Sequence, residues 1–141
     1  VFEGKILSDF RISKSIPTVK NLLLNKNRVI ILSHFGRPQE GKYDEALSLK
    51  IIHEKLESLI GEKITFSKDW IEGIDFENNN IVLCENVRFQ EGEKKNSSEL
   101  AMKIANLGDI FIFDAFGVSL IVKKPQHMVL LTFLRRTQVI F

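Results

Sequence analysis

Apolar positions recur at helical spacing in the first part of the chain. Between residues 11 and 26 the apolar residues that fall near one helix face are Ile12, Ile16, Val19, Leu22 and Leu23. Pro17 lies inside this run, and proline suits the first turn of a helix. The pattern therefore predicts a helix that begins near Pro17 and ends at residues 25–27.

Two further helices are predicted from spacing and from capping residues. Ser48 can cap a helix that runs to about Ile60, with Gly61 as its stop. A second helical pattern extends from Ser98 to Leu107 and is closed by Gly108.

Short apolar runs between these helices predict strands that are buried on both faces, as in parallel sheets. The predicted strands are residues 28–33, 64–66, 81–84 and 109–114. Strands that alternate with helices favour an α/β fold, in which a parallel sheet is covered by helices on both faces. The sequence thus predicts a three-layer α/β/α architecture.

Composition narrows the class of protein without changing this prediction. The chain has 141 residues, 44% of them hydrophobic and 27% charged, with a net charge of +2. These values are typical of one soluble globular domain and give no argument for a nucleic-acid partner, so none is expected. Cys84, the single cysteine, excludes an intrachain disulfide and is expected to be a small buried residue in a strand.

No apolar run is long enough for a membrane span, and no signal peptide precedes the first strand. The chain does not begin with methionine. We therefore expect a cytoplasmic fragment with no membrane partner.

Candidate chemistry gathers where the predicted strands end. In open parallel sheets, ligands bind at the carboxyl ends of the strands. The residues that follow three of the strands are 34–37, 85–88 and 114–117, and two of these segments contain an arginine, Arg37 and Arg88. We expect the sheet to bring these two arginines together.

Two arginines at one edge of a sheet point to an anion site. Guanidinium groups pair bidentately with phosphate and carboxylate oxygens. His34 adds a donor, Gly36 lets backbone amides approach an anion, and Arg11 lies at or before the start of a helix. The alternative is that these arginines are solvated surface charges. No metal-ligand spacing and no glycine-rich nucleotide loop is present in the sequence, so neither a metal site nor a cofactor site is predicted.

The same segments resemble the phosphoglycerate kinase family. The matching blocks are Asp9–Ile12 with Pro17–Thr18, Ser33–Pro38, Leu83–Phe89 with Gly92–Glu93, and Asp114–Gly117. Their order and spacing agree with the family over about residues 3–119. The resemblance implies a partial Rossmann-like fold, the N-terminal lobe of such a kinase with its first strand missing. The sheet would then lack a central strand and expose unpaired edges.

The resemblance also implies an activity. Family members reversibly transfer a phosphoryl group between ATP and 3-phosphoglycerate, giving ADP and 1,3-bisphosphoglycerate in glycolysis. The implied substrate-binding residues are Arg11, His34, Phe35, Gly36, Arg37 and Arg88, with Arg11 also catalytic. Mg-ATP or Mg-ADP would be bound by a C-terminal lobe absent from this chain, so no cofactor is expected here and the fragment is expected to be inactive alone. The complete enzyme is usually a monomer.

The tail departs from the family. After Ser119 the family continues His-Arg-x-x-Ala-Ser-Thr-x-Gly, whereas this chain reads differently from Leu120 onward. Codons for Ile121–Val129 can be chosen so that the neighbouring frame encodes that missing block. We therefore expect residues 1–119 to form a partial phosphoglycerate-binding domain and residues 120–141 to be an aberrant, frame-shifted tail. The competing interpretation is a basic, apolar segment that docks on a membrane or a partner, or an aggregation-prone strand.

Two functions thus remain open from the sequence. The first is a phosphoglycerate kinase half-domain whose intact parent performs the transfer. The second is an anion-binding α/β module without a catalytic role.

Overall fold

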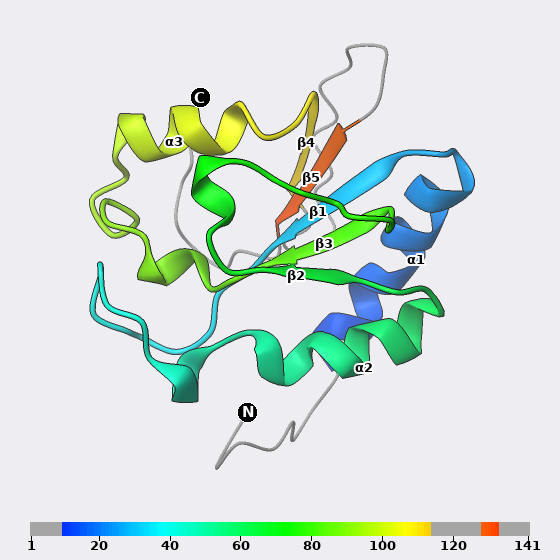
Figure 1. Ribbon diagram of the computed structural model, residues 1–141, viewed down its shortest axis with the longest axis horizontal. Coiled ribbons are helices and arrows are strands. Elements are labelled where there is room, and N and C mark those ends of the chain that lie inside the picture. Colours follow the sequence, from blue (N-terminus) through cyan, green and yellow to red (C-terminus); the bar gives the residue numbers. More distant parts are fainter. Residues whose placement is uncertain (1–9, 114–127, 133–141) are drawn as a thin grey trace.

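The chain forms a parallel sheet with helices on both faces (Figure 1). The computed structural model describes residues 10–113 and 128–132. Within them the strands are β1 (Arg28–Leu32), β2 (Thr65–Ser67), β3 (Ile81–Cys84), β4 (Ile110–Phe113) and β5 (Met128–Thr132). The helices are α1 (Phe10–Leu24), α2 (Lys50–Ile60) and α3 (Ser98–Ala105), with 3-10 turns η1 (Glu45–Leu47), η2 (Trp70–Glu72) and η3 (Val87–Phe89). All neighbouring strands are parallel, in the order β2-β3-β1-β5-β4.

Strand β1 separates two hydrophobic cores. Its alternate residues Val29 and Ile31 pack against α1 and α2, and Ile30 packs on the opposite face against α3. Helices α1 and α2 lie together on one side of the sheet in Figure 1, and α3 lies on the other. The predicted three-layer α/β/α architecture is therefore confirmed.

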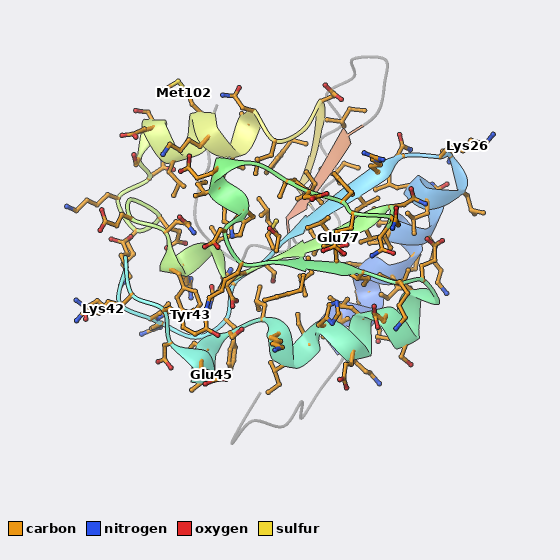
Figure 2. The ribbon with its side chains drawn as sticks, in the orientation of Figure 1. Lys26, Lys42, Tyr43, Glu45, Glu77 and Met102 are labelled. Atoms are coloured by element: carbon orange, nitrogen blue, oxygen red, sulfur yellow. The ribbon has the colours of Figure 1, made fainter. Side chains whose placement is uncertain are left out.

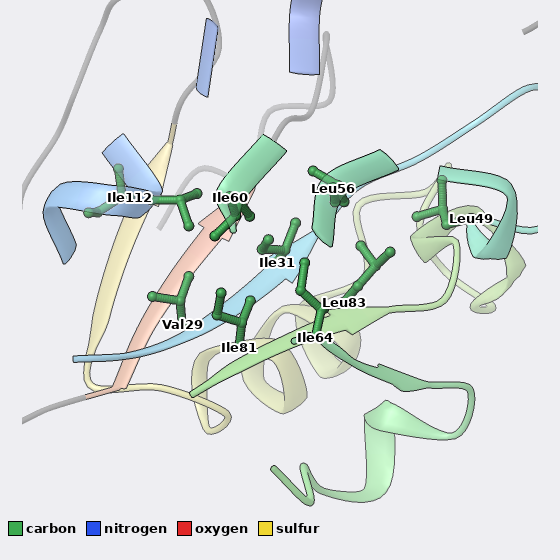
Figure 3. Close-up of a cluster of buried hydrophobic side chains, with 10 residues drawn as sticks. Val29, Ile31, Leu49, Leu56, Ile60, Ile64, Ile81, Leu83 and Ile112 are labelled. Carbon is green, nitrogen blue, oxygen red and sulfur yellow. The ribbon is translucent and has the colours of Figure 1, made fainter. Parts of the chain in front are cut away.

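The core beneath α2 is built from branched side chains of both strands and helices. Figure 3 shows Leu56 and Ile60 of α2 above Ile31 of β1, with Ile81 and Leu83 of β3 beside them. All of these side chains are at least 95% buried. Burying one such side chain stabilises the fold by about 1.5–3 kcal/mol. The cluster therefore packs α2 onto β1 and β3 of the sheet.

The second core explains Cys84. This residue is fully buried among Ile30, Val82 and Leu100 of the α3 face. Burial raises the pKa of the Cys84 thiol, which keeps it protonated and unreactive. The expectation of a small buried strand residue is confirmed.

Helix α1 begins seven residues earlier than predicted. It starts at Phe10, and Pro17 lies inside it. An interior proline costs about 3 kcal/mol in an isolated helix. Here Ile12, Ile16 and Val19 on both sides of the proline pack on the sheet, and their burial outweighs that cost. The predicted start near Pro17 was wrong because propensity gave way to tertiary packing.

The ends of α2 are close to those predicted. Leu49 is the N-cap residue, and the Ser48 hydroxyl accepts the Lys50 N–H at 3.1 Å, so Ser48 caps from one position earlier. Gly61 closes the helix with φ 86°, a left-handed conformation that favours glycine.

None of the helices described in residues 10–113 has the length and apolar character that a membrane span requires.

Strand β5 comes from the tail that the sequence marked as aberrant. It pairs in parallel with β1, Val29 opposite Val129, and with β4, Ile110 opposite Val129. Residues 128–132 therefore occupy the position between β1 and β4, although the sequence led us to expect a sheet that lacks a central strand. The inner edges of β1 and β4 are paired rather than exposed.

Removing β5 is expected to destabilise the sheet. A chain that ends at residue 127 leaves the edges of β1 and β4 unpaired, and we expect it to lose cooperative urea unfolding and to aggregate. The matched control ends at Thr132, which keeps β5 and removes only the nine residues after it. Circular dichroism and size-exclusion chromatography of the two chains provide the measurement. Identical unfolding midpoints would contradict the assignment of β5 to the sheet.

A pH effect is expected where α2 meets β2. The Glu57 carboxylate accepts the Ile64 N–H at 2.9 Å and pairs with Lys63 at 3.1 Å, and these contacts lower the pKa of Glu57 from its usual 4.5. A lowered pKa in the folded state stabilises the fold fully above pH 4.5, and this stabilisation disappears as the pH falls through the folded-state value. Urea unfolding from pH 6 to pH 3 should show a stability difference between the parent and Glu57→Gln that shrinks with acidity. A difference that is constant over this range would refute the assignment.

Candidate functional site

The carboxyl ends of β1 and β3 lie side by side, as the strand-end rule predicts. The two strands pair in parallel with Ile31 opposite Leu83. Beyond the strands, the Val87 N–H donates to the Ser33 carbonyl at 3.1 Å, which joins the two following loops. The segments 34–37 and 85–88 are therefore brought together, while the third predicted segment, residues 114–117 with Asp114, lies outside the described residues.

The Arg88 guanidinium is fixed between these two loops. Its Nη1 donates to the Gly36 carbonyl at 2.6 Å, and its Nε lies 3.6 Å from a carboxylate oxygen of the buried Glu93. The Arg88 side chain is 21% exposed. A guanidinium has five N–H donors, so these two contacts leave donors for an incoming anion. The group is positioned but not saturated.

Arg37 stands on the neighbouring loop, one residue beyond the carbonyl that holds Arg88. It is exposed, whereas the following Pro38 is buried and anchors the loop. Gly36 adopts φ +65°, and a Cβ at this position would lie 2.5 Å from a methyl carbon of Leu47. A side chain here would be strained in this conformation and would require Leu47 to move, so the bend favours glycine. His34 and Phe35, which precede the bend, are partly buried. The structure thus brings five of the six predicted site residues together.

Arg11, the sixth, lies in the first turn of α1, and its side chain is outside what the structure describes. The three residues 25–27 join α1 to β1, so the helix runs back along the strand that it packs against. A helix of 15 residues is ~22 Å long, and a strand of five residues is ~17 Å long. The start of α1 therefore reaches the level of the carboxyl end of β1. Its catalytic role stays a prediction.

Lys94 adds a positive charge beside these two loops. It is exposed, yet its Nζ donates to the Pro38 carbonyl at 3.1 Å and its backbone N–H donates to a Glu40 carboxylate oxygen at 2.7 Å. The contact fixes the second loop against the first. Figure 2 shows Lys42 of the loop after β1 and Lys26 of the loop before β1 at opposite ends of the molecule. The site loops lie at the Lys42 end.

A buried carboxylate beneath the two loops was missed from the sequence. Glu85 is 3% exposed, and its carboxylate accepts hydrogen bonds from the Leu49 N–H at 2.8 Å and the Ser48 hydroxyl at 2.6 Å. The indole N–H of Trp70 donates to the Glu85 carbonyl at 2.9 Å. The sequence signal for this buried carboxylate was the Glu85-Asn86 pair directly after an apolar strand. Polar side chains that are buried so close to an apolar strand must find hydrogen-bond partners.

A shallow hollow beside α3 is a weaker candidate for anion binding. Its lining includes Glu72, Glu91 and Glu99, and Lys103 in the same lining lies 3.7 Å from Glu72 and 3.9 Å from Glu99. The excess of carboxylates there repels anions. Within the part of the chain that the structure describes, no group of three potential metal ligands occurs.

Comparisons with known proteins agree with this geometry. The family model described as "Phosphoglycerate kinase" matches residues 1–128. The phosphoglycerate kinase of Francisella tularensis subsp. novicida is 45% identical over 119 residues, which are 84% of this chain and 30% of that protein. The phosphoglycerate kinase of Legionella pneumophila is 45% identical over 117 residues, 83% of this chain and 30% of its own length.

A solved structure shows the same fold. The phosphoglycerate kinase from Coxiella burnetii superimposes with a TM-score of 0.76 at 34% identity, covering 94% of this chain and 36% of that one. The chain thus spans about a third of the length of the proteins it matches. With the paired strand ends and the family model over most of its length, the chain belongs to the phosphoglycerate kinase family.

Proposed function

We propose that the paired strand ends bind 3-phosphoglycerate and 1,3-bisphosphoglycerate. Arg37 and Arg88 contact the 3-phosphate, and His34 with the backbone at Phe35 and Gly36 completes the cradle. The observation that carries this proposal is the 2.6 Å hydrogen bond from Arg88 to the Gly36 carbonyl. This bond joins the loop after β1 to the loop after β3, so that Arg37 and Arg88 belong to one basic site. Planar guanidinium groups held in this way suit the oxygens of a phosphate group.

The complete protein, in this proposal, transfers a phosphoryl group between ATP and 3-phosphoglycerate in glycolysis. Arg11 points its positive charge toward the carboxyl end of the substrate and stabilises negative charge on the phosphoryl group that is transferred. Such a role is expected because phosphoryl transfer depends mainly on positioning and electrostatic stabilisation. Mg-ATP or Mg-ADP is held by a nucleotide lobe that corresponds to the part of the relatives that this chain does not span. We place this enzyme in the cytoplasm, as a monomer.

We infer that residues 1–119 carry the phosphoglycerate site and that a change of reading frame separates them from residues 120–141. Strand β5 of the second segment pairs within the sheet, but in this proposal its residues are read in another frame than the family block. Support comes from the codons of Ile121–Val129, which can be written so that the neighbouring frame encodes the family block. Resequencing the locus tests this proposal. A locus whose bases do not encode that block in any frame would end it.

Substituting the site arginines is expected to weaken phosphoglycerate binding. A charge-assisted hydrogen bond contributes about 1.5–3 kcal/mol, so Arg37→Ala and Arg88→Ala should each reduce affinity by about ten- to a hundredfold. Calorimetric titration of the parent chain and of each variant with 3-phosphoglycerate measures the effect. The matched control is Arg28→Ala at the opposite end of β1, where Arg28 lies over the Phe76 ring at 5.0 Å.

Arg28→Ala should bind as the parent does. An equal loss of affinity in all three variants would show that general positive charge, and not this site, attracts the substrate. Tight ATP binding by the parent would contradict the assignment of the chain to the phosphoglycerate side of the enzyme.

We also expect no kinase turnover from this chain alone, because its proposed site binds the phosphoryl acceptor and not the nucleotide. A coupled assay with ATP and 3-phosphoglycerate provides the measurement. ATP-dependent turnover by the purified chain would overturn this expectation.

A further inference from the structure

Asn86 lies fully buried two residues after the end of β3, beneath the two arginine-bearing loops. Its Nδ2 donates to the Phe35 carbonyl at 2.7 Å and to the Leu47 carbonyl at 2.9 Å. Its Oδ1 accepts the Phe35 N–H at 3.3 Å and the Arg88 N–H at 3.1 Å. An amide has two donors and two main acceptor positions, and here all four are used.

These four bonds join three segments that are distant in the sequence. Phe35 belongs to the loop after β1, Leu47 to η1, and Arg88 to η3. Both backbone groups of Phe35 are bound by the one side chain, so Asn86 acts as a strand-like partner for that residue. The next residue, Gly36, supplies the carbonyl that fixes Arg88 and is followed by Arg37. The position of both arginines therefore depends on where Phe35 is held.

Asn86 is itself held from below. Its backbone N–H donates to the Glu85 carboxylate at 2.7 Å, and that carboxylate also binds the Ser48 hydroxyl and the Leu49 N–H at the start of α2. The Glu85 carbonyl is bound by Trp70. Because each of these groups is buried, the amide of Asn86 is carried on a rigid base.

We propose that Asn86 is a positioning residue for the anion site: it holds the backbone of Phe35 so that Arg37 and Arg88 are set at one fixed spacing before the ligand arrives. The proposal rests on the proposed function for the identity of the ligand, 3-phosphoglycerate. A site whose loops are ordered in advance binds more tightly, because the ligand does not have to order them.

The local and the long-range roles of Asn86 can be separated by one substitution. Asn86 is the N-cap residue of η3, where its side chain accepts the Arg88 N–H. Serine caps equally well but is too short to reach Phe35 and Leu47. Asn86→Ser therefore keeps the turn that carries Arg88 and removes the bonds to the other two segments.

The matched control is Asn79→Ser, made at the amino end of β3. Asn79 is partly buried, and its Nδ2 donates to the Thr65 hydroxyl at 2.9 Å. The substitution also removes a side-chain hydrogen bond, away from the arginine loops. It serves as the reference for any loss of affinity that merely follows from lower stability.

The test combines calorimetric titration with 3-phosphoglycerate and ¹⁵N relaxation of the free chain, at a temperature where circular dichroism shows each protein folded. For Asn86→Ser we expect affinity to fall about tenfold or more, as for loops that must be ordered on binding. Order parameters of Gly36 and Arg37 should fall from about 0.85 to below about 0.6, the range of flexible backbone. Asn79→Ser should match the parent in both measurements.

Each outcome decides between the two proposals. Unchanged affinity in Asn86→Ser overturns the positioning role, even if the loop becomes mobile. If the parent itself does not bind 3-phosphoglycerate, the proposed function fails, and relaxation alone decides: unchanged order at Gly36 and Arg37 overturns the positioning role, and reduced order supports it. If Asn86→Ser does not fold, Asn86→Asp replaces it in the relaxation measurement, because aspartate keeps both acceptor contacts and loses both donations.

Discussion

Strand β1 constrains the rest of this structure. It pairs with β3 on one edge and with β5 on the other, and its residues from Val29 to Leu32 are buried on both faces. A strand in this position has every backbone group satisfied by its neighbours, and its side chains leave no face free for solvent. The cores under α2 and α3 are therefore both built on β1, and the loop that follows it emerges at a defined place beside the loop after β3.

The carboxyl end of β3 brings polar groups into the protein interior. Glu85 and Asn86 follow four apolar residues, and both are at least 97% buried. A buried carboxylate is unfavourable unless donors surround it. Here the Ser48 hydroxyl and two backbone N–H groups supply them, and the negative charge lies at the start of α2, where the helix dipole favours it. The same bonds that compensate the burial also fix α2 to the end of the sheet.

The proposed anion site is a consequence of this arrangement. Arg88 is aligned by a backbone carbonyl of the neighbouring loop, and Gly36 bends that loop in a conformation that favours glycine. Binding of a phosphate by such groups depends on their prior alignment, because the favourable charge interaction is reduced by whatever ordering must accompany it.

Much of the fold and the site follows from local patterns. The strands β1 and β3, the end of α2 at Gly61 and the adjacency of Arg37 and Arg88 were predicted, because apolar run length, a glycine stop and the strand-end rule depend on short stretches of sequence. The family motifs occur in these same stretches. The sequence by itself therefore determined the layered architecture and the location of the basic site.

Three features were decided only by tertiary structure. Helix α1 passes through Pro17 because burial of its apolar face exceeds the local cost of proline. Strand β5 lies between β1 and β4 because the place of a strand in a sheet depends on which backbone edges are available, and its own residues do not encode that. The Asn86 side chain bonds to residues that lie 51 and 39 positions away in the sequence. Local patterns of apolar and polar residues cannot predict hydrogen bonds over such separations. The sequence placed the arginines at one edge, and the folded chain set their alignment, because alignment requires hydrogen bonds between segments that meet only after folding.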